Sequence, residues 1–238
     1  MPIMLTSPRI ETASRKQHGR TLLNYPLKNI EICLNNRKFQ LTVVDDPDQY
    51  LETLSKEDVE GTLFLPYWTY LWESSIGLAQ YLSDNRTTLS NKSILEIGCG
   101  YGLAGIVTAK LGAEVTFTDF EHDALLFTRH NSQQNETSTG TYVQMDWSAP
   151  CFQKRFNVVL GADVIYEEQN WDSIIELLQN LLELNGIAIF SEPNRKNADE
   201  FFKLIRENGF TFKKSICSIS LQEKTAKINI FQVKHTKR

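Results

Sequence analysis

The stretch Ile94-Leu95-Glu96-Ile97-Gly98-Cys99-Gly100-Tyr101-Gly102 decides the fold of this 238-residue chain. An apolar run containing one acid, Glu96, leads into three alternating glycines, and residues 103–111 then have the composition of a helix. Because glycine has no Cβ, a turn built from it lets the backbone close on a ligand. Asp119 ends the next apolar run. This layout predicts a crossover that binds the adenosine part of a cofactor.

Strand-like and helix-like segments alternate after this stretch, which predicts a parallel sheet covered by helices. The expected strands are 94–97, 114–118, 142–145, 157–160 and 187–190, and the expected helices are 103–111, 122–131, 171–184 and 198–208. Two further strand-like runs, 210–220 and 226–234, have no helix between them, so they should pair antiparallel. We expect a three-layer α/β/α domain with about seven mostly parallel strands and an antiparallel last strand.

The N-terminal quarter of the chain has a different pattern. Residues 30–34 and 39–44 alternate in polarity around Asn35-Asn36 and predict a β-hairpin, followed by a short helix near 50–54. A further helical pattern covers residues 71–82. We divide the chain into a flexible N-terminal arm (1–20), the hairpin and short helix (21–60) and a cofactor-binding domain (61–238).

Composition narrows the possible partners. The net charge of −4 argues against a protein that grips nucleic-acid backbones, and no apolar run reaches transmembrane length. The four cysteines are scattered without CxxC spacing, which is typical of reduced thiols in the cytosol, and the four histidines form no metal-ligating set. We expect a cytoplasmic monomer with no metal, nucleic-acid or membrane partner. Basic residues in the arm leave a targeting segment as an alternative to a disordered tail.

The segment from Gly100 to Gly105 also matches the dinucleotide pattern G-x-G-x-x-G, with Asp119 near the expected offset. By itself this match leaves a dinucleotide oxidoreductase open. Two features favour another cofactor: Glu96 stands before the glycines, and the cluster already begins at Gly98. In addition, the expected strands form a single sheet that takes up the chain, which leaves no room for the second, substrate-binding half of a dinucleotide enzyme.

The whole pattern resembles the class I S-adenosylmethionine-dependent methyltransferases, which have a Rossmann-like fold. In that family an E/D-x-G-x-G-x-G loop wraps the amino-acid end of the cofactor, and the matching positions here are Glu96, Gly98, Gly100 and Gly102. The resemblance implies that Asp119 accepts hydrogen bonds from the ribose hydroxyls, that Phe120 packs on the adenine and that Asp146 accepts from the adenine amino group. Alone, Asp146 would be a turn or cap residue; its register with the other positions favours the ligand role.

A narrower resemblance comes from two segments that flank the glycines. Residues 65–73 (LPYWTYLWE) precede the first strand, and Gly161-Ala162-Asp163-Val164-Ile165-Tyr166 ends the fourth. Together they are similar to the methyltransferase-16 group, whose signatures are a tryptophan before the first strand, here Trp72, and a D-x-x-Y/F motif. The resemblance covers the chain from about residue 30 onward. Some members of the group are labelled nicotinamide N-methyltransferases, so membership does not give the substrate.

The resemblance assigns roles on the two sides of one site. Methyl transfer from a sulfonium is an in-line displacement, in which positioning supplies much of the catalysis, and burial of a lysine in an aromatic slot lowers the pKa of its amine. Asp163 would hydrogen-bond the acceptor amine or the cofactor's amino group, and Tyr166 and Trp72 would wall the site with π density. Core packing would explain Trp72 equally well, and a strand-end hydrogen bond is the alternative for Tyr166. Trp72 is also predicted to bind the cofactor, and the other predicted cofactor-binding residues are Cys99, Leu103, Trp147 and Ala162.

The sequence therefore predicts an S-adenosylmethionine-dependent N-methyltransferase that methylates a lysine side chain of a protein and releases S-adenosylhomocysteine. We predict Asp163 and Tyr166 as its catalytic residues. A small-molecule N-methyltransferase acting on a nicotinamide-like amine or heterocycle is the alternative enzyme. A non-catalytic protein that keeps the cofactor fold and docks a partner is the alternative from a different class.

Overall fold

The structure is a computed structural model that describes residues 22, 25–57, 66–85, 89–137, 139–221 and 224–236. The expected arm at 1–20 lies outside the described residues. The same holds for residues 61–65, at the start of the expected cofactor-binding domain, and for residues 222 and 223 of the last turn.

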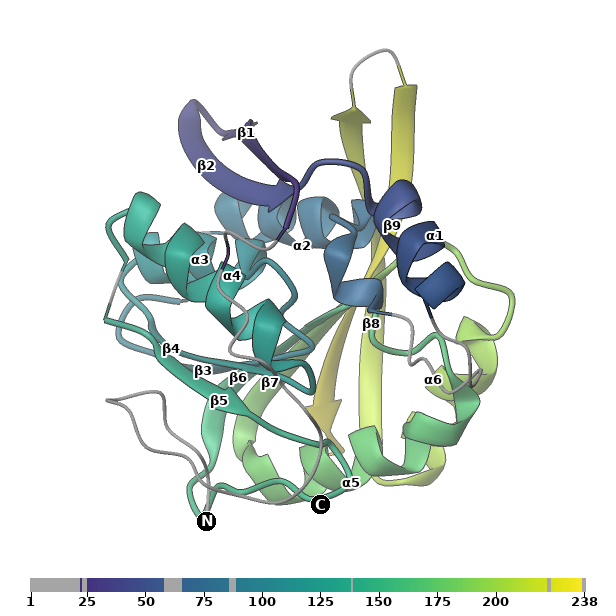
Figure 1. Ribbon diagram of the computed structural model, residues 1–238. Coiled ribbons are helices and arrows are strands. Elements are labelled where there is room, and N and C mark those ends of the chain that lie inside the picture. The colour runs from purple at the N-terminus through teal and green to yellow at the C-terminus, as the bar shows by residue number, and fades with distance from the viewer. Residues whose placement is uncertain are drawn as a thin grey trace.

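A seven-stranded sheet forms the centre of the described chain, in the order β5-β4-β3-β6-β7-β9-β8 (Figure 1). Its strands are β3 (Ser93–Ile97), β4 (Glu114–Asp119), β5 (Thr141–Gln144), β6 (Phe156–Ala162), β7 (Leu182–Glu192), β8 (Phe210–Leu221) and β9 (Lys224–His235). Strands β3 to β7 pair in parallel, whereas β9 runs antiparallel between β7 and β8. The predicted mostly parallel sheet with a reversed last strand is confirmed.

Helices cover both faces of the sheet, because neighbouring residues of each strand point to opposite sides. Ile94 belongs to a hydrophobic cluster with residues of three helices on one face, and Leu95 belongs to a second cluster with residues of two helices on the other. The helices of the first face are α2 (Glu73–Asp84), α3 (Leu103–Lys110) and α4 (His122–Gln134), and those of the second are α5 (Trp171–Leu181) and α6 (Ala198–Glu207). The expected three layers are therefore present.

Several expected helices differ from the structure at their ends; for example, the helix expected over 122–131 continues to Gln134. The helix expected over 171–184 stops at Leu181, because Leu182 takes extended dihedral angles and pairs with Phe156 as the first residue of β7. The helix expected near 50–54 is longer and forms α1 (Pro47–Glu57). It starts earlier because the Gln49 backbone N–H donates to the Asp46 carboxylate at 2.9 Å and proline is favoured in the first turn of a helix.

The N-terminal hairpin consists of β1 (Leu27–Leu34) and β2 (Arg37–Val44), joined through Asn35 and Asn36 in the left-handed conformation. It docks on α4, where the Thr42 N–H donates to the Asn131 side-chain oxygen at 2.8 Å. The buried side chains of Phe39, Leu41 and Val43 belong to the same cluster as α2, α3 and α4. The hairpin therefore shares the core of the main sheet.

Tyr101 joins the hairpin to the rest of the fold. Its hydroxyl accepts from the Val44 N–H at 2.9 Å and donates to the Thr69 carbonyl at 2.7 Å, in the short 3-10 helix η2 (Tyr67–Thr69). Its ring packs edge-on against Trp68 and Phe127. One buried hydroxyl thus connects three segments that are far apart in the sequence.

Replacing Tyr101 by phenylalanine should lower the free energy of unfolding by about 1–3 kcal/mol, because a buried N–H and a buried C=O lose their partner. Urea denaturation measures this loss. Tyr142→Phe is the matched control, since the buried Tyr142 hydroxyl satisfies no backbone N–H or C=O group among the described residues. The control should stay within about 0.5 kcal/mol of the wild type. Equal losses in the two variants would contradict the role given to the Tyr101 hydroxyl.

Candidate active site

A cavity of about 580 Å³ lies where the parallel strands end. Gly98 follows β3, Asp119 ends β4, Met145 follows β5 and Ala162 ends β6, and all four line the cavity. This edge is where open α/β sheets bind ligands. The predicted site residues that line it are Trp72, Gly98, Cys99, Gly100, Asp119, Phe120, Asp146, Trp147, Ala162, Asp163 and Tyr166. Glu96, Gly102 and Leu103 are buried beside it and are not part of the lining.

The glycine loop (residues 98–102) has positive φ at Gly98, Gly100 and Gly102. A Cβ on Gly102 would stand 2.5 Å from Thr128 Cγ2, so both conformation and space require glycine there. Cys99 lies between the first two glycines, and burial raises the pKa of its thiol, which is consistent with a neutral lining residue.

Glu96 supports the start of α3, directly after the glycine loop. Its carboxyl accepts a hydrogen bond from the Gly105 N–H at 3.0 Å, and a Cβ on Gly105 would stand only 2.4 Å from the Glu96 Oε2 atom. Burial raises the pKa of Glu96 to about 8, so this carboxyl carries a proton at neutral pH. The observed contact positions the first turn of α3. A direct contact of Glu96 with the cofactor stays a prediction.

Asp119 presents a buried carboxylate to the cavity. One oxygen accepts from the Gly100 N–H at 2.9 Å and the other from the Glu121 N–H at 3.0 Å. Burial raises the pKa of Asp119 to about 6, so it is mostly ionised at pH 7. Each carboxylate oxygen has further lone pairs, which suits two adjacent hydroxyls. Phe120 beside it is 51% exposed and offers an aromatic face at the same edge.

Asp146 and Trp147 form the neighbouring wall. The Asp146 Oδ1 atom accepts from the Ser148 N–H and hydroxyl, both at 2.8 Å, which is the turn role that the sequence left as an alternative. The Trp147 indole N–H is buried and has no partner among the described residues. An unpaired buried donor is unfavourable, and an acceptor on a bound ligand would satisfy it. A Cβ on Gly98 would stand 3.2 Å from the Trp147 ring, so the turn at Gly98 lies directly beside the indole. The wall formed by Asp146, Trp147 and this turn therefore fits a polar ligand.

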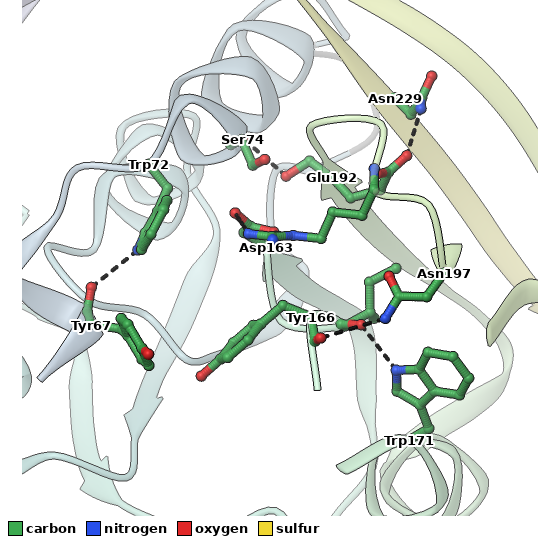
Figure 2. A network of polar contacts seen from close by, with 12 residues as sticks. Tyr67, Trp72, Ser74, Asp163, Tyr166, Trp171, Glu192, Asn197 and Asn229 are labelled. Carbon is green, nitrogen blue, oxygen red and sulfur yellow. Dashed lines mark hydrogen bonds and ion pairs between the residues drawn. The ribbon is translucent and has the colours of Figure 1, made fainter. Parts of the chain in front are cut away.

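Aromatic rings form a further part of the cavity lining. Trp72 precedes α2, and its indole N–H donates to the Tyr67 carbonyl at 3.0 Å (Figure 2). The ring centroids of Tyr67 and Tyr166 lie 6.0 Å apart in an edge-on arrangement. Burial raises the pKa of Tyr166 to about 12, so its hydroxyl stays protonated. Trp72 therefore lines the cavity instead of packing on the buried face of a helix.

Asp163 has a partner that the sequence reasoning missed. Its two carboxylate oxygens accept from Nε and Nη2 of Arg195 at 2.7 and 2.8 Å, and only 3% of its side chain is exposed. Arg195 lies in the loop after β7, 32 residues further along the chain. The sequence contains a signal for this contact, because charged residues follow the expected strand 187–190, the parallel strand expected after 157–160. The ends of neighbouring parallel strands meet at one edge of a sheet, so residues that follow two such strands can come into contact.

Comparison with known families identifies the chain. Residues 68–208, more than half of the sequence, match the protein family described as lysine methyltransferase. The chain belongs to this family. Membership supports S-adenosylmethionine as the cofactor, as the glycine loop indicated.

Several named relatives of this lysine methyltransferase family member are protein methyltransferases. The chain is 32% identical to mouse protein N-lysine methyltransferase METTL21A over 60% of its own length and 69% of the relative. It is 32% identical to mouse histone-arginine methyltransferase METTL23, covering 58% of that protein. It is 34% identical to a histidine protein methyltransferase 1 homolog of Dictyostelium discoideum, of which it spans only 40%.

Solved structures with low sequence identity share the fold. Magnesium protoporphyrin IX methyltransferase of Synechocystis aligns with a TM-score of 0.54 at 15% identity, over 79% of this chain and 95% of that one. A TehB-like methyltransferase of Corynebacterium glutamicum gives the same TM-score at 15% identity, over 80% and 98%. This likeness confirms the Rossmann-like methyltransferase architecture. None of the helices in the described ranges is long and apolar enough to cross a membrane.

Glu96→Gln should flatten the dependence of stability on pH. Because the folded pKa of about 8 lies above the ordinary 4.5, the folded state holds the proton more tightly, and this contribution to stability is lost as pH rises towards 8. We expect the wild type to lose roughly 2 kcal/mol of unfolding free energy between pH 6 and 8, and the variant far less. Urea denaturation at both pH values checks this. Exposed Glu114→Gln is the control and should follow the wild type.

Binding of S-adenosylhomocysteine should weaken below pH 6, because protonated Asp119 can no longer accept two hydroxyl donors freely. With a pKa of about 6, the ionised fraction falls roughly tenfold between pH 7 and 5, and the affinity should fall with it. Isothermal titration measures this. Asp119→Asn should bind more weakly without that pH dependence, whereas Asp146→Asn should keep it. If the affinity of Asp119→Asn kept the pH dependence of the wild type, the assignment of Asp119 to the ribose would be wrong.

Proposed function

We propose that this protein is an S-adenosylmethionine-dependent N-methyltransferase that methylates a lysine side chain of a protein. One observation supports it above the others: a single cavity is lined both by the glycine loop with Asp119 and by the aromatic side chains of Tyr67, Trp72 and Tyr166. A cofactor held by the first group would have its reactive end near the second.

In this proposal the bound cofactor supplies an electrophilic methyl group. The chain's own residues position it: the glycine loop bounds the amino-acid end, and Asp119 holds the ribose. The aromatic wall excludes water from the acceptor and provides an apolar slot, which favours the neutral form of an amine over its ammonium form. The Tyr166 hydroxyl, protonated at neutral pH, can donate to or accept from the acceptor. Positioning two reactants in line supplies most of the rate enhancement.

The assignment of lysine rests on the family description and on the names of relatives. The family is described as lysine methyltransferase, and METTL21A is named a protein N-lysine methyltransferase. Other relatives are named for histidine and arginine, so all of these names support a protein substrate while the modified side chain differs among them.

We further propose a cytoplasmic monomer without nucleic-acid or membrane partners. The four cysteines are free thiols, which is typical of a reducing compartment. The net charge of −4 does not favour binding to polyanions.

The function is tested by incubating the purified protein with a cell extract and S-adenosylmethionine carrying a tritiated methyl group. We expect label in protein, and methyl-lysine after acid hydrolysis. Asp119→Ala is the inactive control, because it removes the carboxylate proposed to hold the ribose. Glu114→Gln is the surface control and should label like the wild type.

The outcomes separate the alternatives. Label in methylhistidine or methylarginine would show that the methylated side chain is histidine or arginine instead of lysine. Label confined to small molecules would favour the small-molecule N-methyltransferase. Binding of S-adenosylhomocysteine without transfer to any component of the extract would favour the non-catalytic binding protein.

A further inference from the structure

The acceptor side of the cavity contains a salt bridge that the proposed reaction does not explain. Arg195 and Asp163 meet through two parallel hydrogen bonds of 2.7 and 2.8 Å, the strongest geometry for this pair. Asp163 has φ of +56°, an unfavourable conformation for a non-glycine residue. Its backbone N–H donates to the Ser191 carbonyl at 2.8 Å, which ties this conformation to the end of β7.

A second set of contacts fixes Arg195 in place. Glu192 is completely buried, and one of its oxygens accepts from the Arg195 backbone N–H at 2.5 Å. Its other oxygen accepts from the Asn229 side chain on β9, also at 2.5 Å. The arginine is therefore held at both its backbone and its guanidinium, and its orientation towards Asp163 is set before any ligand binds.

The guanidinium is not part of the cavity lining, but it contacts a second residue that is, Tyr166. It lies 5.8 Å from the centroid of the Tyr166 ring, within the range of a cation–π contact. The Asn197 side chain contacts the Tyr166 carbonyl at 3.5 Å from the same loop. Two groups on this wall that could attract an ammonium ion, the Asp163 carboxylate and the Tyr166 ring, already face a cation.

We propose that Arg195 is a positioning and specificity residue, which withholds Asp163 and Tyr166 from cationic groups so that the acceptor site takes a neutral nucleophilic nitrogen. This proposal rests on the methyltransferase function proposed above. A nitrogen attacks carbon through its lone pair, which an ammonium ion lacks. An unpaired carboxylate beside the acceptor would stabilise that unreactive ion, and Arg195 prevents this.

Two cofactor analogues test the proposal without knowledge of the acceptor. S-adenosylhomocysteine lacks the methyl group, whereas sinefungin has a carbon in place of the sulfur and a primary amine, charged at neutral pH, in place of the methyl group. Both have the same adenosine and amino-acid ends. The ratio of their dissociation constants at pH 7, from isothermal titration, therefore reports how the acceptor side treats a cation.

In Arg195→Met the affinity for sinefungin relative to S-adenosylhomocysteine should rise on the order of tenfold, the scale of one charge-assisted hydrogen bond. Arg195→Lys should give a smaller rise, since one ammonium cannot engage both carboxylate oxygens as a guanidinium does. The double variant Arg195→Met/Asp163→Asn should return to the wild-type ratio. Arg206→Met is the matched control: the Arg206 guanidinium lies 4.3 Å from the ring of Phe212, which is not a lining residue, whereas that of Arg195 contacts two lining residues, so the ratio should not change.

A ratio in Arg195→Met within twofold of the wild type, with both ligands bound, would overturn the proposal. A rise that persists in the double variant would overturn it as well, because the gain would not come from Asp163. If Arg195→Met does not fold, the Arg195→Lys ratio decides: a rise supports the proposal and an unchanged ratio overturns it. Failure of the wild type to bind S-adenosylhomocysteine would instead remove the proposed function.

Discussion

The turn after β3 is the constraint on which the rest of the site depends. Three residues with positive φ reverse the chain within five positions, and at Gly102 the Thr128 side chain leaves no space for a Cβ. The same turn sends the Cys99 N–H to the Thr118 carbonyl at 3.0 Å and the Gly100 N–H to Asp119. The loop is thereby fastened to β4, and it also carries Tyr101 into the core, where that residue holds the hairpin. The cofactor side of the cavity, the start of α3 and the position of the N-terminal hairpin therefore all depend on the backbone conformation of this turn.

Three of the buried acids at this edge of the sheet are stabilised in three different ways, and each way determines what the acid can do. Glu96 meets a single backbone donor and stays protonated, so it supports the loop as a neutral group. Asp119 receives two backbone N–H donors and is ionised at neutral pH, which leaves an anion facing the cavity. Asp163 is paired with a guanidinium, so its charge is neutralised within the protein. Only Asp119 thus presents an anion of these three to a ligand with hydroxyl donors.

Much of this arrangement could be predicted from the sequence, because the signals are local. Strand alternation, the Asn-Asn turn and the glycine loop are all set by neighbours in the chain, and the predicted sheet was confirmed in type and number of strands. The end of the helix expected over 171–184 was wrong, since pairing of Leu182 with Phe156 overrides a continuous apolar pattern. Arg195 could not be found in this way. Its contact with Asp163 joins two loops 32 residues apart, and no periodicity reports which side chains meet across such a distance. Only the rule that the ends of neighbouring parallel strands meet at one edge of a sheet indicates this region.

The reversed strand β9 connects both sides of the proposed acceptor slot, although it lies outside the cavity lining. Ile228 on β9 packs so closely on α2 that a Cβ at Gly77 would stand 2.7 Å from it, and Trp72 stands directly before this helix. The next residue, Asn229, holds Glu192, which holds Arg195. Since successive side chains of a strand point to opposite faces, one strand can fix the aromatic side through one residue and the salt bridge through the next. The C-terminal hairpin, formed by β8 and β9, is therefore part of what shapes the slot. A change in the register of β9 would move Trp72 and Arg195 together.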